Sequence, residues 1–445
     1  MKEDKLPPSG WHRKHALPSL SEAHRSVHVP ENGSWFRKLF AFAGPGLMVA
    51  VGYMDPGNWA TDLAAGAQFG YTLLTVILIS NCIAMLLQHL SLKLGVVAER
   101  DLAQACRDHY SKPVSFFLWV ICEIAIAACD LAEVIGTAIA LQLLFDIPLP
   151  IGILITALDV FIILYLQERG FRRVEAIVGA LIVVIGGCFL YQIIVSQPEM
   201  AALVEGFIPK TEIITNPAML YIAIGILGAT VMPHNLYLHS SIIQTRNYKR
   251  DEAGKREAIH FATVDSTLSL GLAFFVNAAI LILSAAVFHG TEHAGISDIS
   301  DAYKLISPVV GDPWASTLFA VALLASGQNS TVTGTMAGQI VMEGFLDLKL
   351  RPWLRRLITR AIAIVPALIV AIYYGERGVG SLLVFSQVIL SLQLSFAVFP
   401  LLNFTSSKKK MGVFANSALV KWAAYACAFV IAGLNLYLVM QVIAL

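Results

Sequence analysis

Apolar segments long enough to cross a lipid bilayer recur from residue 41 to the end of the chain. A membrane-spanning helix needs roughly 17–25 predominantly apolar residues. The chain is 57% hydrophobic and only 14% charged, whereas soluble domains are about 25% charged. The sequence therefore predicts an all-α polytopic membrane protein with about eleven spans, which we place at 41–68, 71–96, 114–145, 149–167, 173–195, 217–244, 259–288, 315–345, 354–374, 379–405 and 417–444.

The distribution of Lys and Arg predicts the orientation of these spans, because cytoplasmic connections are enriched in both residues. With a cytoplasmic N-terminus, the even-numbered connections lie inside, and they contain RDHYSK, ERGFRR, RNYKRDEAGKRE, LKLRPWLRR and SKKKMG. The odd-numbered connections carry only Lys210, Lys304 and Arg377. We therefore expect a multi-pass protein of the cell membrane with its N-terminus in the cytoplasm and its C-terminus outside.

The chain divides into three parts. Residues 1–38 contain Pro, Ser, His and charged residues without an apolar period or a signal-peptide core, so we expect a disordered cytoplasmic tail. We expect residues 39–405 to form a core of ten helices, and residues 406–445 to form a cytoplasmic loop and the eleventh helix. The six cysteines show no metal-type spacing and are expected to be buried thiols.

Two spans are interrupted by residues that break helices. The first contains DPGN at 55–58, and the sixth contains MPHN at 232–235. The two spans are five apart, so they belong to halves with opposite orientations. Paired Gly/Pro interruptions in corresponding spans indicate a binding site near the midplane of an inverted-repeat transporter, since non-helical backbone at that depth must line a cavity or be buried in protein. A proline kink alone is usually structural, but an intramembrane Asp is costly and functional by default.

The side chains of the two interruptions suit a cation. They offer the Asp55 carboxylate, the Asn58 amide oxygen, the Met232 sulfur and freed carbonyls such as that of Ala229. Mg²⁺ and Ca²⁺ prefer shells made only of oxygen, whereas a thioether favours softer first-row transition ions. Met232 on its own would more often be a packing residue, and its place beside Asp55 and Asn58 is what makes it a candidate ligand.

At these two motifs the sequence resembles the Nramp (natural resistance-associated macrophage protein) family of divalent metal transporters, and specifically its bacterial manganese transporters. The resemblance extends to CDLAEVIGTAIAL, TVTGTMAGQIVMEGFL and SQVILSLQL, and covers nearly everything from about residue 40 onward. It implies a LeuT-like fold, with spans 1–5 and 6–10 as inverted repeats and helices 1 and 6 broken, and proton-coupled uptake of Mn²⁺ and Fe²⁺. The implied metal ligands are Asp55, Asn58, Ala229, Met232, Gln387 and Gly52.

A line of carboxylates in the third span predicts a proton route. Glu123, Asp130 and Glu133 lie broadly along one helical face, and such a line in a membrane serves a proton relay or an ion path. Static ion pairs are the alternative. Further candidates are two histidines near the break in span 6 and three arginines at the start of span 9, namely His234, His239, Arg355, Arg356 and Arg360. The resemblance implies proton roles for Asp55, Asp130, Glu133 and His234.

Several other functions remain open at this stage. The chain has no Walker loop, nucleophile elbow or zinc cluster, so we expect no enzyme and no cofactor. The expected partners are the metal ion, the proton as co-substrate and the lipid bilayer, without nucleic acid, and the sequence is compatible with a monomer. The alternatives are a LeuT-fold sodium- or proton-coupled transporter of an organic solute such as an amino acid, and a channel or metal sensor. A fixed Asp55 argues against a site for a carboxylate-bearing solute. Polar residues of span 8, and Asp265 and Asn277 of span 7, are weaker candidates, and we favour helix packing for span 8.

Overall fold

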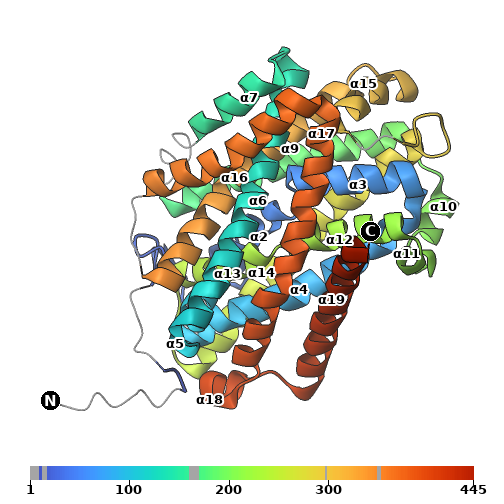
Figure 1. The fold of residues 1–445 in the computed structure, drawn as a ribbon. Helices are drawn as coiled ribbons and strands as arrows, with labels where there is room; N and C mark the ends of the chain where they lie inside the picture. The colour runs from blue at the N-terminus through green and yellow to red at the C-terminus, as the bar shows by residue number, and fades with distance from the viewer. Residues whose placement is uncertain (1–9, 13–17, 160–169, 296–297, 348–351, 445) are drawn as a thin grey trace.

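The computed structural model describes residues 10–12, 18–159, 170–295, 298–347 and 352–444. These residues form helices and one pair of two-residue strands, which confirms the predicted all-α fold (Figure 1). The first half contains α1 Trp35–Phe42, α2 Pro45–Gly52, α3 Pro56–Phe69, η1 Gly70–Leu73, α4 Leu74–Ala98, α5 Leu102–His109, α6 Lys112–Phe145, α7 Leu149–Ile155, η2 Thr156–Leu158, α9 Phe171–Ser196, α10 Met200–Glu205 and α11 Glu212–Thr215.

The second half repeats the pattern of a broken helix followed by long helices. It contains α12 Pro217–Thr230, α13 Pro233–Ile242, η3 Ile243–Thr245, α14 Glu252–Phe288, α15 Ile299–Val310, α16 Ala315–Leu346, α17 Pro352–Thr405, α18 Lys408–Met411, η4 Gly412–Phe414 and α19 Ala418–Ala444. The element α17 holds two of the predicted spans, because Gly375 interrupts it with a φ of 64° and a ψ of −157°. The strands β1 Val27–His28 and β2 Arg246–Asn247 pair in parallel.

Eight helical segments of the described chain are long and apolar enough to cross a membrane, compared with the eleven spans predicted. They are Pro56–Ala98, Lys112–Phe145, Phe171–Ser196, Pro217–Thr245, Glu252–Phe288, Leu357–Gly375, Gly378–Thr405 and Ala418–Met440. The first joins the second half of span 1 to span 2. The predicted span 4 has only the shorter apolar helix Leu149–Leu158, and residues 160–169 of that prediction lie outside the described residues. Span 8 corresponds to α16, whose stretch SGQNSTVTGT makes it less apolar than the others.

Both predicted helix breaks are present. In the first, α2 ends at Gly52 and α3 begins at Pro56, and the N-cap Asp55 accepts a hydrogen bond from the Asn58 backbone N–H. In the second, α12 ends at Thr230 and α13 begins at Pro233. A proline at the first helical position lacks a donor that the helix could not use there, so it starts a new helix well.

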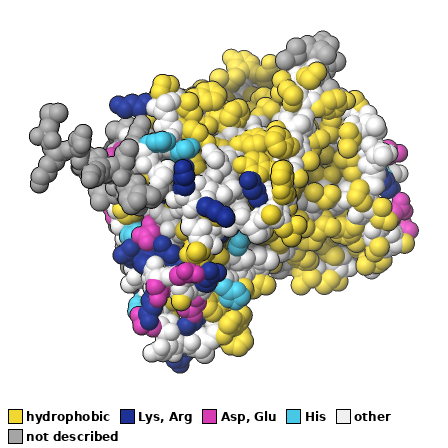
Figure 2. Space-filling view, turned by 90° about the horizontal axis from the view of Figure 1, so that it is seen from below, with side chains coloured by type: hydrophobic (Ala, Val, Ile, Leu, Met, Phe, Trp, Pro, Cys, Tyr) yellow, Lys and Arg dark blue, Asp and Glu magenta, His cyan; other side chains and the backbone are white. Residues whose placement is uncertain are grey.

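The outer surface of the helices is strongly apolar, as expected for contact with lipid. Side chains such as Val183, Leu419 and Tyr373 are more than 70% exposed. Figure 2 shows hydrophobic side chains over much of one face and charged side chains gathered at one side of it. Figure 1 places α5 and α18 at one end of the molecule and α10, α11 and α15 toward the other end. We call the end with α5 and α18 the N-terminal face, because Trp11 packs there against Phe404.

Part of the N-terminal tail is folded against the helices, although the sequence predicted disorder for residues 1–38. The Trp11 side chain is only 3% exposed; its ring centroid lies 5.5 Å from that of Phe404, with the Lys410 Nζ 4.9 Å from the Trp11 ring. Residues 35–38 already belong to α1. These described residues contact the helices through isolated side chains and backbone groups, which leave no periodic apolar pattern in the sequence.

A cluster of buried charges holds the start of α2. The Asp265 carboxylate of α14 accepts hydrogen bonds from Gly46 N, at 2.7 Å, and Gly44 N, at 3.4 Å. Arg246 is fully buried and pairs with the Glu175 carboxylate of α9 at 2.7 Å. The same guanidinium donates to Ala43 O at 2.8 Å. Acidic side chains stabilise a helix N-terminus, so this cluster fixes α2 to α9 and α14.

Candidate metal site between the two broken helices

Asp55 lies at the centre of the first break and is fully buried. Its Oδ1 accepts hydrogen bonds from the Asn58 backbone N, at 2.9 Å, and from Asn58 Nδ2, at 2.8 Å. Its Oδ2 is buried and has no hydrogen-bond partner among the described residues. A buried polar atom without a partner is costly in free energy, so this oxygen is suited to receive a ligand from outside the protein.

Three predicted ligand oxygens converge on one atom, the amide nitrogen of Asn58. Asn58 Nδ2 donates to Asp55 Oδ1 at 2.8 Å, to Ala229 O at 3.2 Å and to Gly52 O at 3.4 Å. The carbonyl of Ala229 comes from the second broken helix, so Asn58 joins the two breaks. The two ends of an amide differ little in shape, and a rotated Asn58, which would give up its hydrogen bond from Asn277 Nδ2, would present its oxygen to the same point. This arrangement then offers a cation four oxygen atoms.

The position of the Asn58 amide is set by Asn277 of α14. Asn277 Nδ2 donates to Asn58 Oδ1 at 3.2 Å and to Tyr53 O at 2.8 Å. Sequence analysis placed Asn277 only among the weaker polar candidates. Its relation to Asn58 depends on the packing of α14 against α3, which no local motif reports.

Met232 and Gln387 complete the predicted ligand set. Met232 is fully buried in the second break and packs with Cys129 and Leu390. The Gln387 amide lies against Gly57, where a Cβ atom would stand 1.8 Å from Gln387 Nε2. Its Oε1 is buried without a hydrogen-bond partner in the described part of the chain. Gly57 is therefore needed for Gln387 to reach the first break.

The donor set matches a soft divalent ion better than a zinc or calcium site. It combines a single carboxylate with amide and carbonyl oxygens and a thioether, and the described residues contain no group of three His, Cys, Asp or Glu side chains that could hold a metal. Structural zinc sites use four Cys or His ligands, and Ca²⁺ takes six to eight oxygens.

One carboxylate of α6, that of Glu133, lies beside a buried arginine. Arg360 Nη1 lies 3.7 Å from Glu133 Oε2, and Arg360 Nη2 lies 3.4 Å from Asp159 Oδ2. Arg360 also donates to Asp130 O at 3.4 Å and to Thr331 Oγ1 at 2.8 Å. Asp159 was not identified from the sequence, and Thr331 was only one of the weaker polar candidates of span 8, because nothing in their local motifs points toward span 9.

A thiol connects this cluster to the second break. Cys129 Sγ lies 3.7 Å from Glu133 Oε1 and 3.8 Å from His234 Nε2. His234 follows Met232 closely in α13 and is only 2% exposed. The structure therefore brings His234 and Glu133 to the same small region.

The other residues predicted for the proton route contact different side chains. His239 Nδ1 lies 2.9 Å from Gln88 Oε1, and Gln88 Nε2 donates to the Tyr53 hydroxyl at 2.8 Å, so His239 is linked to the first break. Glu123 accepts a hydrogen bond from Trp119 Nε1 at 3.0 Å. The side chains of Arg355 and Arg356 lie outside the described residues.

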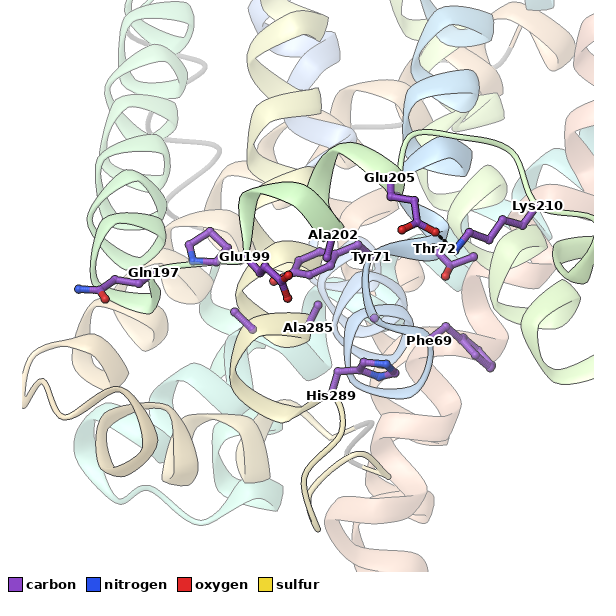
Figure 3. Close-up of a pocket in the computed structure, with 14 residues that line it drawn as sticks. Phe69, Tyr71, Thr72, Gln197, Glu199, Ala202, Glu205, Lys210, Ala285 and His289 are labelled. Atoms are coloured by element: carbon purple, nitrogen blue, oxygen red, sulfur yellow. Dashed lines mark hydrogen bonds and ion pairs between the residues drawn. The ribbon is translucent and has the colours of Figure 1, made fainter.

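A separate cavity of about 470 Å³ lies at the opposite end of α3 from Asp55 (Figure 3). It is bounded by Phe69, Tyr71, Glu199 and His289, and by the ion pair of Glu205 with Lys210 at 2.9 Å. It shares no residue with the predicted metal site.

The fold and the site together define an all-helical membrane protein of the LeuT-like class, with two broken helices meeting at a buried carboxylate. Two solved structures of low identity show this fold alone. Mhp1, a nucleobase-cation-symport-1 family transporter, matches with a TM-score of 0.57 at 13% identity over 98% of this chain and 94% of that chain. MhsT matches with a TM-score of 0.61 at 16% identity over 89% of this chain and 97% of that chain.

The natural resistance-associated macrophage protein-like (Nramp) family matches residues 46–441, and the chain belongs to this family. It is 61% identical to the divalent metal cation transporter MntH of Listeria innocua over 96% of both chains. It is 63% identical to the protein of the same name from Bradyrhizobium diazoefficiens, over 94% of this chain and 93% of that one. The crystal structure of the Eremococcus coleocola manganese transporter matches with a TM-score of 0.87 at 44% identity, over 94% of this chain and 90% of that chain.

Proposed function

We propose that this chain imports divalent transition metal ions, Mn²⁺ and also Fe²⁺, together with protons, by alternating access. The observation that carries the proposal is the convergence of Asp55 Oδ1, Gly52 O and Ala229 O on the Asn58 amide between the two breaks. The relatives named as divalent metal and manganese transporters support the same substrate class.

In this proposal the metal is held by the residues of the two breaks. Asp55 supplies the negative charge, and Asn58, Gly52, Ala229 and Gln387 supply neutral oxygens. Met232 supplies the sulfur that disfavours Ca²⁺ and Mg²⁺. A dehydrated divalent ion gains most from the one formal charge, because electrostatic interactions are strong in a buried site.

Protons take a second route through α6. Arg360 faces two carboxylates, Glu133 and Asp159, so one guanidinium is shared by two acidic groups and a proton can balance the second. Asp130 and His234 border this cluster, and we assign them to the same route. Residues His239, Glu123, Arg355 and Arg356 stay candidates for its two ends.

The membrane potential supplies the driving force in the proposed orientation, with the N-terminal face in the cytoplasm and the C-terminus outside. An interior-negative potential of 100 mV contributes about 2.3 kcal/mol for each positive charge that moves inward. A divalent ion accompanied by one proton therefore gains about 7 kcal/mol from the same potential, without ATP.

Uptake of Mn²⁺ by the purified protein in liposomes tests the proposal. We expect uptake that an inside-negative potential and an acidic exterior both accelerate, with acidification of the lumen as Mn²⁺ enters. The matched control is Asp55→Asn in the same liposomes, which should bring uptake to the level of empty vesicles. Uptake that ignores the pH gradient would contradict proton coupling, and uptake of an amino acid in place of Mn²⁺ would support the organic-solute alternative.

A further inference from the structure

The described N-terminal residues Ser19–Val29, which we call the N-terminal strap, are attached to α5 and α16 at one end. Ser19 Oγ donates to Asp101 Oδ2, the N-cap of α5, at 2.7 Å. Leu20 N donates to Glu343 Oε2 of α16 at 3.1 Å. Ser19 and Asp101 are both buried, so this end of the strap is held by a hydrogen bond protected from water.

The other end of the strap is attached to the loop that follows the second broken helix. Arg25 N donates to Gln244 O at 3.1 Å, β1 pairs with β2, and Val29 N donates to Asn247 O at 3.4 Å. Val27 and Val29 are each 7% exposed, and Val29 packs in the same cluster as Phe42 and Tyr248. The strap therefore bridges α5 and α16 on one side and the segment around β2 on the other.

The strap lies directly beside the cluster that holds α2. The first residue of β2 is Arg246, whose register partner on the strap is Val27. The Arg246 guanidinium binds Glu175 and the carbonyls that precede α2. Arg246 is also the residue with which Val27 of β1 pairs. A displacement of α2 that breaks the contacts of Arg246 must therefore also disturb the pairing of β1 with β2.

Alternating access requires relative movement of these two groups of helices. In transporters of this architecture, one group of helices rocks against the rest around the fixed binding site. Release of metal toward the N-terminal face would separate the segment around α2 and β2 from α5 and α16. A strap fixed to both groups has to detach at one of its ends before this happens.

The β1–β2 end is the weaker attachment. Its polar contacts are a two-residue ladder and two backbone hydrogen bonds, of 3.1 Å from Arg25 N and 3.4 Å from Val29 N, whereas the opposite end includes a 2.7 Å hydrogen bond between two buried side chains. Leu20 and Arg25 also have φ angles of 53° and 54°, a left-handed conformation that is unfavourable for residues other than glycine. The strap is therefore bent by its docking and can relax when β1 leaves β2.

We propose that the N-terminal strap closes the cytoplasmic side of the transporter, and that β1 separates from β2 each time metal is released into the cytoplasm. This inference rests on the proposed metal import, and it adds a residue range outside the membrane to the transport cycle.

A reversible cross-link tests it. His28 and Asn247 are register partners, both exposed and outside the metal site. Neighbouring strands lie about 4.8 Å apart, which is within the Cα separation that a disulfide can bridge. The experiment measures Mn²⁺ uptake and Mn²⁺ binding by the full chain carrying His28→Cys with Asn247→Cys, oxidised and then reduced, with the two single variants as controls.

We expect oxidation to lower uptake at least tenfold in the double variant only, to leave Mn²⁺ binding within twofold of the parent, and to be reversed by dithiothreitol. Uptake at the parent's rate by the oxidised double variant would overturn the proposal. Failure of the parent and the reduced variant to take up Mn²⁺ would instead contradict the proposed import.

A second variant weakens the strap. Val29→Asp places a charge in an apolar cluster and should release β1, so that the resting protein opens more often to the cytoplasm. We expect the KM for external Mn²⁺ to rise at least threefold while uptake continues, and the exposed Glu22→Gln on the same strap to leave the KM unchanged. An unchanged KM in folded Val29→Asp would also count against the strap.

Discussion

The first helix break and the carboxylate cluster of α6 both bury acidic side chains in the membrane-spanning core, but they balance the charge differently. Asp55 contacts amide groups only, and one of its oxygens has no hydrogen-bond partner among the described residues. Glu133 lies 3.7 Å from the guanidinium of Arg360. A buried charge needs a partner, and the two regions obtain it from different sources.

This difference separates the two proposed substrates. The groups that donate hydrogen bonds to Asp55 are amides and carry no positive charge. A transported metal ion can therefore supply the balancing charge. Glu133 already has a positively charged partner in Arg360. In our proposal it can therefore lose a proton without becoming an unpaired buried charge. If an arginine lay beside Asp55, its guanidinium would compete with the metal ion for the carboxylate.

The largest expected effect comes from removing the charge of Asp55. Asp55→Asn keeps the shape of the side chain and its cap on α3, and we expect Mn²⁺ affinity to fall at least 100-fold, about 2.8 kcal/mol. Calorimetry on the folded variant measures this, with the exposed Asp301→Asn as control. Affinity within a few-fold of the parent would show that the neutral oxygens alone hold the metal, and the contrast between the regions would fail.

Neutralising Glu133 should act on protons and stability. Glu133→Gln should lower Mn²⁺-driven proton entry about tenfold and leave Mn²⁺ binding within a few-fold of the parent. It should also destabilise the fold by about 3–5 kcal/mol, because Arg360 loses a partner in a buried site. Asp130→Asn should also weaken proton entry and leave Mn²⁺ binding within a few-fold of the parent.

Paired fluorescence assays of metal and proton movement, together with thermal unfolding in detergent, measure these effects. Asp146→Asn, at the exposed end of α6, is the control. Lumen acidification at the parent's rate in both Glu133→Gln and Asp130→Asn would show that these carboxylates serve only as static ion pairs.

Met232→Ala sharpens the comparison within the metal site, because it changes selectivity while the charge stays. Cd²⁺ should lose about tenfold in affinity, Mn²⁺ only a few-fold, and Ca²⁺ should begin to compete, since the site no longer replaces an oxygen with sulfur. Competition uptake assays decide it. The control is Met219→Ala, at a buried methionine at the start of the same broken helix, which should leave the discrimination among Cd²⁺, Mn²⁺ and Ca²⁺ unchanged. If Met232→Ala also leaves it unchanged, the Met232 sulfur is a packing group and not a metal ligand.

The smallest effect is expected at Asn277, which touches the site only through other residues. Asn277→Ala removes the donors to Asn58 Oδ1 and Tyr53 O, so Asn58 is less well oriented and Mn²⁺ affinity should fall about threefold to tenfold. Ser284→Ala removes another bond from α14 to α3, at Leu63 O, and should not alter affinity. Equal effects of the two variants would point to loosened helix packing as the cause.

The sequence predicted the two breaks because these depend on local chemistry. Pro56 and Pro233 each begin a helix where a continuous span was otherwise expected, and Asp55 stands out by its charge among apolar residues. The partners of these residues could not be predicted in the same way. Asn277, Asp159 and Thr331 belong to other helices, and only the packing of the chain brings them to Asn58 or Arg360.

The number of spans and the tail were the least predictable parts. Helix α16 is largely buried and contains many small and polar residues. Its apolar content is therefore a poor guide to whether it spans the membrane. The tail lacks periodicity, yet Trp11 and the strap find partners on α17 and β2. Such contacts depend on which surfaces the finished helices leave available.

The contact of Trp11 with Phe404 also fixes an order of events during synthesis. Trp11 precedes Phe404 by 393 residues, so its partner is made only after nearly all the membrane helices. At about 5–20 residues per second, the tail waits roughly 20–80 s for that site to exist. Trp11 is therefore among the last side chains to be buried, and a chain interrupted before α17 would leave it exposed, where proteases and chaperones can recognise an unfinished transporter.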